Sequence, residues 1–134
     1  MTAPNIKSPT TVTGKSAITK ITGTTATSIL ANASASGKAL KINSVFAANV
    51  SANDNVYIDL YITRSSTNYY LAYQVVIPYS ATQILVRKDT YIYLEEGDTL
   101  YFKSAVVNGV DVCVSYEDIS WCLRTEDLLV AFLI

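Results

Sequence analysis

Acidic side chains are the residues of this 134-residue chain with the most capacity for chemistry. Glu95, Glu96 and Asp98 fall within one short stretch, and Glu117 and Asp118 follow later. Two carboxylates can serve as general acid and base when they face each other across a cleft with their pKa values driven apart. The first three acids lie in a polar stretch between two apolar segments, which predicts a solvated turn. A calcium loop is the alternative, although the stretch lacks the alternate-residue ligand spacing of an EF-hand.

Histidine is absent from the chain, which removes the commonest general base and the commonest metal ligand. Ser-His-Asp and Cys-His catalytic sets are therefore excluded. The two cysteines, Cys113 and Cys122, are too few for a four-ligand zinc site. They could close a small disulfide loop or remain reduced thiols. The isolated glycines do not form a phosphate-binding loop. We expect no catalysis, no cofactor and no bound metal.

Tyrosine is the remaining unusual residue, with ten copies. Tyr57 and Tyr61 fall on the outward phase of one predicted strand, whereas Tyr91 and Tyr93 share one face of a short strand before the acidic turn. Tyrosine suits interfaces because its ring is amphipathic and its rotamers are few. Ordinary packing, a protein–protein interface and sugar stacking are the three interpretations of these residues.

The elements that must position these residues are strands. Half of the residues are hydrophobic and 16% are charged, which excludes a mostly disordered chain. The length suits one domain. Alternating apolar segments, separated by turn signals about every ten residues, predict an all-β fold: an antiparallel β-sandwich of the jelly-roll or Ig-like type with eight or nine strands. The predicted strands are 17–21, 25–31, 39–49, 56–63, 69–77, 82–87, 90–94, 99–107 and 110–116.

The alternation also predicts which side chains form the core. In 39–49 one face carries Leu40, Ile42, Ser44, Phe46 and Ala48, and in 69–77 one face carries Leu71, Tyr73, Val75 and Ile77. Asn108-Gly109 predicts a two-residue hairpin between 99–107 and 110–116. The polar turn at 51–55 predicts either a hairpin or a connection between sheets.

The two ends of the chain differ from the predicted sandwich domain at 17–120. Residues 1–16, with Pro4 and Pro9, predict an extended N-terminal arm that is either loose or ordered on a neighbour. Residues 121–134 form an apolar C-terminal extension, which we expect as a last strand, a subunit contact or a short helix. The sequence shows no signal peptide, and its longest apolar run is too short to span a bilayer. We therefore expect synthesis in the cytoplasm and no membrane partner.

Charge is divided unevenly along the chain. Residues 1–53 hold five lysines and no acid, whereas residues 54–134 hold five basic and eleven acidic residues. Interleaving of the strands would mix these charges on the surface. The alternative is two faces of opposite sign that dock against copies or neighbours. Five scattered lysines do not form a nucleic-acid site, so we expect no nucleic-acid partner.

Three segments carry a resemblance to a known family. They are ITGTTATSILANASASGKALKINSVFAANV at Ile21–Val50, KDTYIYLEEGDTL at Lys88–Leu100 and SYEDIS at Ser115–Ser120. The stretch from Ile18 to Ser120 resembles a family of small tailed-phage virion structural proteins, found in phages of cyanobacteria and other aquatic bacteria. The family commonly has proline at the place of Tyr91, and Trp121–Ile134 extends beyond its usual ending.

The resemblance implies a structural component of the virion rather than an enzyme. A capsid decoration (cement) protein that clamps neighbouring shell subunits is the expected role. A neck, collar, tail or fibre-adaptor subunit is the alternative, followed by a carbohydrate-binding module on a fibre. The expected partners are further copies, as a dimer or trimer, and the major capsid protein or other virion proteins. The candidate interface residues are Pro4, Pro9, Tyr57, Tyr61, Tyr91, Tyr93, Trp121 and Phe132.

Overall fold

The computed structural model describes residues 11–120. Within that range it contains nine β-strands, one short 3-10 helix and no α-helix, so the predicted all-β fold is confirmed. β-Branched and aromatic residues fill these strands because they pack well on a pleated surface. The strands are β1 (Thr11–Ile21), β2 (Thr27–Ala31), β3 (Lys38–Asn49), β4 (Val56–Arg64), β5 (Thr67–Ile77), β6 (Thr82–Val86), β7 (Ile92–Leu94), β8 (Thr99–Ser104) and β9 (Val110–Ser120); the 3-10 helix η1 is Lys88–Thr90.

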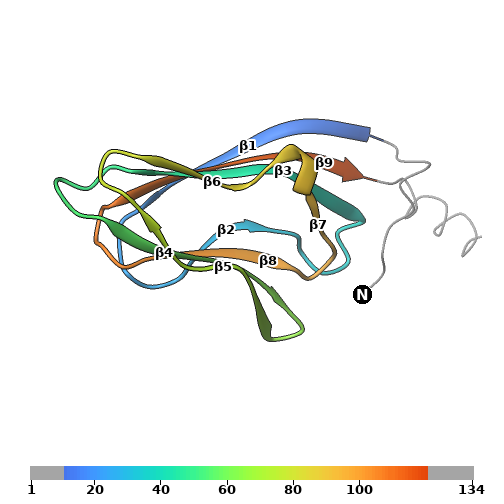
Figure 1. The fold of residues 1–134 in the computed structure, drawn as a ribbon. Coiled ribbons are helices and arrows are strands. Elements are labelled where there is room, and N and C mark those ends of the chain that lie inside the picture. The colour runs from blue at the N-terminus through green and yellow to red at the C-terminus, as the bar shows by residue number, and fades with distance from the viewer. Residues whose placement is uncertain (1–10, 121–134) are drawn as a thin grey trace, which may run out of the picture.

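The strands form two antiparallel sheets that stack as two layers (Figure 1). Sheet I has the order β1-β9-β3-β6, with β7 also paired to β3, and sheet II has the order β2-β8-β4-β5. β6 lies beside residues 45–48 of β3 and β7 beside residues 40–42, so the two act as one edge strand that η1 interrupts. With β6 and β7 counted together, this strand order is that of a jelly roll, the first of the two predicted sandwich types.

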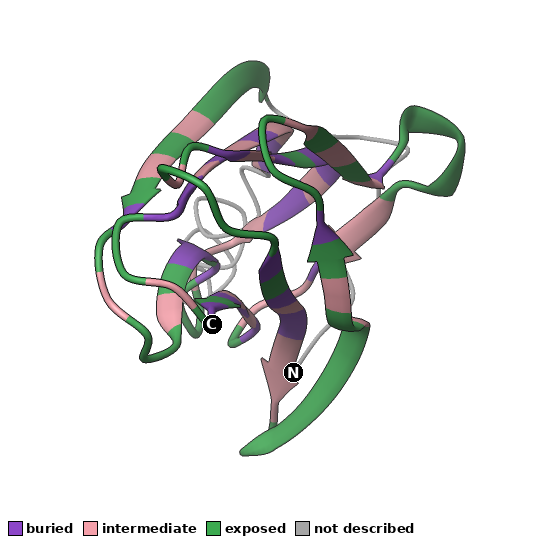
Figure 2. Ribbon diagram, turned by 60° about the vertical axis from the view of Figure 1, so that its left-hand side comes forward, coloured by how far each residue is buried: buried purple, intermediate pink, exposed green. Residues whose placement is uncertain are grey.

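The core lies between the two sheets. Alternate side chains point inward, and Figure 2 shows buried and exposed residues alternating along the strands. Phe102, Leu60, Ile42 and Ile21 are fully buried there. Each such side chain contributes about 1.5–3 kcal/mol when it leaves water. The described strands therefore hold a continuous apolar core of their own.

A bulge in β3 changes the predicted core face of that strand. The register with β9 shifts between Ile42 and Ser44. Beyond this point Val45 and Ala47 are fully buried, while Phe46 faces outward and is 38% exposed. The prediction that grouped Phe46 with Ile42 is therefore wrong, because an extra residue in one strand moves every later side chain to the opposite face.

A second irregularity changes the predicted face of β5. Tyr73 and Gln74 together lie opposite Asp59 of β4, and the Gln74 backbone N–H donates to Asp59 Oδ1 at 2.7 Å. Gln74 has a positive φ of 50°. The bulge leaves Leu71 and Tyr73 exposed, contrary to the prediction that they join the core.

The predicted hairpin at Asn108-Gly109 is also wrong. β8 belongs to sheet II and β9 to sheet I, so this turn carries the chain from one sheet to the other. The two-residue hairpin turn is instead Ser65-Ser66, which joins β4 to β5. Both serines have positive φ, at 52° and 63°, as the type I′ turn of a tight hairpin requires.

The N-terminal part of β1 corrects the predicted start of the sandwich. Residues 11–16, which we expected in the extended arm, pair with residues 115–120 of β9. The remaining arm, residues 1–10 with Pro4 and Pro9, lies outside the described residues, as does the C-terminal extension with Trp121, Cys122 and Phe132.

Candidate functional site

A tyrosine cluster covers part of the outer face of sheet II. Tyr101, Tyr61 and Tyr70 occupy one row across β8, β4 and β5. The Tyr61 ring lies 5.4 Å from Tyr101 and 5.0 Å from Tyr70, centroid to centroid. Tyr73 meets Tyr70 edge to face at 5.0 Å. These spacings are those of attractive aromatic pairs.

Tyr57 and Tyr61, the two candidate interface residues of β4, differ in how far they are exposed. Tyr57 is 54% exposed, whereas Tyr61 is only 9% exposed beneath its neighbours. Burial, followed by the nearby Tyr70 and Tyr101, raises the pKa of Tyr61. Tyr61 thus supports the cluster, whose exposed rings are Tyr70 and Tyr73, and Tyr57 is a separate exposed ring on the same strand. The sequence assigned Tyr73 to the core because the bulge at Tyr73 and Gln74 reverses its phase. A further register shift, between Leu60 and Tyr61, keeps Tyr70 on the outer face.

An apolar row crosses the outer face of sheet I. The register aligns Ile18 of β1, Cys113 of β9, Phe46 of β3 and Ile84 of β6. Ile18 is 77% exposed and Ile84 49% exposed. We call these four residues the apolar row. The sequence did not predict it, since Phe46 was assigned to the core and strand neighbours follow only from the register.

Small and neutral side chains surround much of the apolar row. Ser16, Ser115 and Ser44 occupy the next row on one side. On the other side the Lys20 ammonium lies 2.9 Å from Asp111, and Ala48 and Thr82 complete the row. A surface with an apolar centre and a polar rim has the anatomy of a protein interface.

Tyr91 and Tyr93 lie against each other at one end of sheet I. Their rings meet edge to face with centroids 5.7 Å apart. The Lys41 ammonium lies 4.3 Å from the Tyr91 ring centroid, which is a cation–π arrangement. Tyr91 remains 46% exposed, so it is available for contact beside a positive charge.

The acidic turn proves to be a structural ion-pair site. Asp98 is fully buried and accepts two hydrogen bonds from Arg64, at 2.9 Å from Nε and 2.6 Å from Nη2. The Glu95 backbone N–H also donates to Asp98, and the Glu95 carboxylate lies 3.3 Å from Arg64 Nη2. The hydrogen bond that Arg64 donates to Asp98 is the main cause that raises the pKa of Arg64. The prediction of a solvated turn is therefore wrong for Asp98.

The neighbouring acids are held by protein groups as well. Glu96 accepts a hydrogen bond from the Gly37 backbone N–H at 2.6 Å, and Glu117 accepts one from Asn43 at 3.0 Å. Within residues 11–120, no three His, Cys, Asp or Glu side chains converge on a point that could hold a metal ion.

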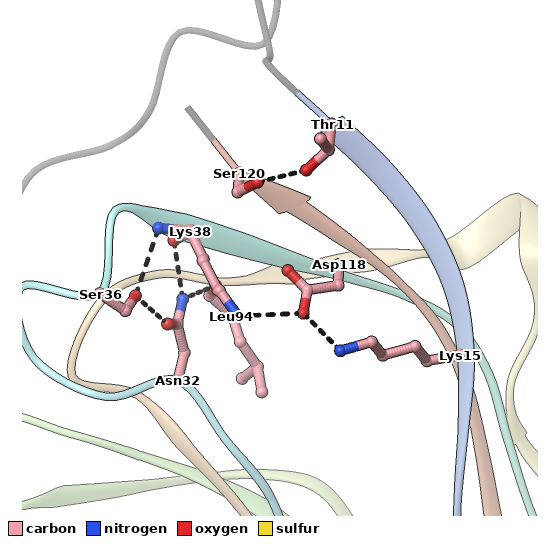
Figure 3. A network of polar contacts seen from close by, with 8 residues as sticks. All are labelled: Thr11, Lys15, Asn32, Ser36, Lys38, Leu94, Asp118 and Ser120. Atoms are coloured by element: carbon pink, nitrogen blue, oxygen red, sulfur yellow. Dashed lines mark hydrogen bonds and ion pairs between the residues drawn. The ribbon is translucent and has the colours of Figure 1, made fainter. Parts of the chain in front are cut away.

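A polar network ties the start of β3 to β1, β7 and β9 (Figure 3). Asp118 accepts hydrogen bonds from Lys15 at 3.0 Å and Lys38 at 3.3 Å. Burial by itself would raise the pKa of Asp118, but the two lysines outweigh it and hold that pKa below its usual value. The buried Asn32 side chain donates to the carbonyl oxygens of Lys38 and Leu94, both at 2.9 Å. This network borders a cavity of about 300 Å³.

A second, larger cavity of about 480 Å³ lies where β4 and β5 face β7. The sequence pattern does not indicate this cavity, since its walls come from three separate segments. Its lining residues are Ile62, Arg64, Tyr69, Ile92, Tyr93 and Glu95.

Cys113 is a half-buried free thiol, and its candidate disulfide partner Cys122 lies outside the described residues.

No helix in the part of the chain that the structure describes is long and apolar enough to cross a membrane. The fold and its surfaces define a jelly-roll β-sandwich with exposed aromatic and apolar groups on both outer faces. Comparison with known proteins finds no matching family model, no matching curated protein and no matching solved structure.

Proposed function

We propose that this chain is a structural subunit of a tailed-phage virion, and within the virion a capsid decoration protein that binds neighbouring shell subunits. The observation that carries the proposal is the apolar row on sheet I. Its exposed isoleucines, Ile18 and Ile84, stand at the two edges of one sheet face, with Phe46 and Cys113 between them. Exposed apolar groups that gather on one face mark an interaction site.

The chemistry of the sheet I face favours a protein partner over a small ligand. Serine, alanine and threonine neighbours are short, so a flat partner surface can approach the apolar row closely. Charge enters at the rim through the Lys20–Asp111 pair. Burial of such a face gives affinity through area and shape. The resemblance of Ile21–Val50, Lys88–Leu100 and Ser115–Ser120 to small virion proteins supplies the identity of the partner class.

Self-association belongs to the same proposal. The chain presents two distinct outer faces, the tyrosine cluster of sheet II and the apolar row of sheet I. One face can contact the shell while the other contacts a second copy, as in a dimer or trimer with closed symmetry. This role requires no reaction and no cofactor, and the protein would reach the virion after synthesis in the host cytoplasm.

Reconstitution on capsid shells tests the proposal. Purified protein should bind shells of the source phage that lack it, in a co-sedimentation assay. Ile18→Lys and Ile84→Lys should each weaken this binding by about ten- to a hundredfold, because each removes one buried apolar side chain from the contact. Val107→Lys is the matched control, since Val107 is 58% exposed and lies in the turn that follows β8.

Failure of the wild-type protein to bind the shells would reject the decoration role. The neck or tail alternative makes a different prediction, with density at the single portal vertex and none across the shell. Labelling of intact particles with an antibody to the purified protein distinguishes the two positions.

A further inference from the structure

The larger cavity combines aromatic walls with a fixed polar pair. Its lining residues Ile62, Arg64 and Tyr69 belong to the β4–β5 hairpin. The tip of this hairpin bends away from the rest of sheet II (Figure 1). Ile62 packs against the core and Tyr69 pairs with it across the hairpin, so both belong to the inner side of sheet II. Tyr93 and Ile92 come from β7 of sheet I. The volume of about 480 Å³ falls in the range of small-molecule sites.

Arg64 is preorganised at the wall of this cavity. Its Nε and Nη2 groups are fixed by the fully buried Asp98, at 2.9 and 2.6 Å. Among the described residues, nothing accepts a hydrogen bond from its third nitrogen, Nη1, and the side chain is 39% exposed. The Glu95 carboxylate, 29% exposed, stands 3.3 Å from Nη2. The cavity therefore offers a fixed donor beside an acceptor.

Charge decides between classes of ligand. Arg64 contributes one positive charge, and Asp98 and Glu95 contribute two negative charges, so the cavity carries a net charge of −1. A phosphate or carboxylate ligand would be repelled. A neutral ligand with hydroxyl groups can instead bond to both Arg64 and Glu95. Tyr69 and Tyr93 both line the cavity, and the Tyr69 ring, which is 57% exposed, offers an apolar surface for the C–H face of such a ligand.

We propose that this cavity binds a short neutral saccharide. One sugar ring packs on Tyr69, which is 57% exposed, while its hydroxyl groups bond to Arg64 Nη1 and the Glu95 carboxylate. The site is distinct from the outer face of sheet II, where Tyr57 and Tyr61 suggest sugar stacking. The inference is independent of the proposed virion role.

A glycan array that carries both neutral and acidic saccharides tests the inference. The wild-type protein should bind neutral saccharides, and titration calorimetry with the best neutral saccharide should give its affinity. Tyr69→Ala should weaken that affinity by about tenfold, since one stacked ring is lost. Tyr69→Phe should retain most of it, because the ring remains. Tyr57→Ala is the matched control, with a ring of similar exposure on the opposite face of the same sheet.

Each other result overturns the inference. An array without binding, or with binding to acidic saccharides alone, contradicts a neutral-sugar site. Binding that Tyr57→Ala abolishes and Tyr69→Ala leaves intact places the site on the outer face. Loss of self-association in Tyr69→Ala, without any saccharide binding, makes the cavity a protein contact. None of these results changes whether the protein binds capsid shells.

Discussion

Removal of the Asp98 carboxylate should destabilise this protein far more than removal of a surface carboxylate. Asp98→Ala leaves the Arg64 guanidinium and the Glu95 backbone N–H without their acceptor. The Arg64 side chain is 39% exposed, so water can reach part of the freed cation. We therefore expect a loss of about 2–3 kcal/mol, somewhat less than the roughly 3–5 kcal/mol that breaking a fully buried ion pair costs.

The converse change should cost more. Arg64→Ala leaves a fully buried carboxylate without its cation, for an expected loss of about 3–5 kcal/mol. Asp111→Ala is the control, because the Lys20–Asp111 pair is 62% and 41% exposed and such pairs contribute at most about 1 kcal/mol. The double variant Arg64→Ala/Asp98→Ala should lose less than the sum of its two single variants.

Urea unfolding at pH 7, followed by fluorescence and circular dichroism, measures these differences. The urea concentration at the midpoint should be highest for Asp111→Ala, lower for Asp98→Ala and lowest for Arg64→Ala, with unchanged m-values. Each 1 kcal/mol corresponds to about 3–5 °C in Tm for a chain of this length. An Asp98→Ala variant as stable as Asp111→Ala would refute the reasoning that the acidic turn is held by a buried ion pair.

Three further changes have defined outcomes. Asp118→Asn should lower the free energy of unfolding by about 1–2 kcal/mol at pH 7. Because folding lowers the pKa of Asp118, the stability difference between the wild type and this variant should shrink as the pH falls below about 4. Urea unfolding at several pH values measures that difference. Gly109→Ala should cost about 1–3 kcal/mol because an added Cβ meets Val106 at 3.1 Å, whereas Gly14→Ala, with nothing within 4 Å, should stay within about 0.5 kcal/mol in the same assay. Asn32→Ala should lower Tm by several degrees, since two backbone carbonyls lose their donor, and an unchanged Tm would contradict that role.

The sequence predicted the fold class well because local alternation is a direct consequence of burial on one face. In β9, Val110, Val112 and Val114 follow the predicted phase and are all buried. The turn spacing predicted the strand number and the sandwich. Bulges could not be predicted, because the one in β5 depends on Asp59, which binds the Gln74 N–H from another strand.

The candidate site was predicted only in part, for the same physical reason. Tyr57 and Tyr61 were correctly placed on an outer face, but the burial of Tyr61 depends on rings from two other strands. The burial of Asp98 depends on Arg64, 34 residues earlier in the chain. The apolar row and the larger cavity each join strands that meet only in the folded sheet order. Single-strand periodicity holds no information on such contacts.

A reconstruction of the intact particle by electron cryomicroscopy tests the virion role most directly. We expect jelly-roll density across the shell, repeated with the capsid lattice, with the Ile18–Ile84 face of sheet I buried against a neighbouring subunit. Particles without any density for this fold would contradict it.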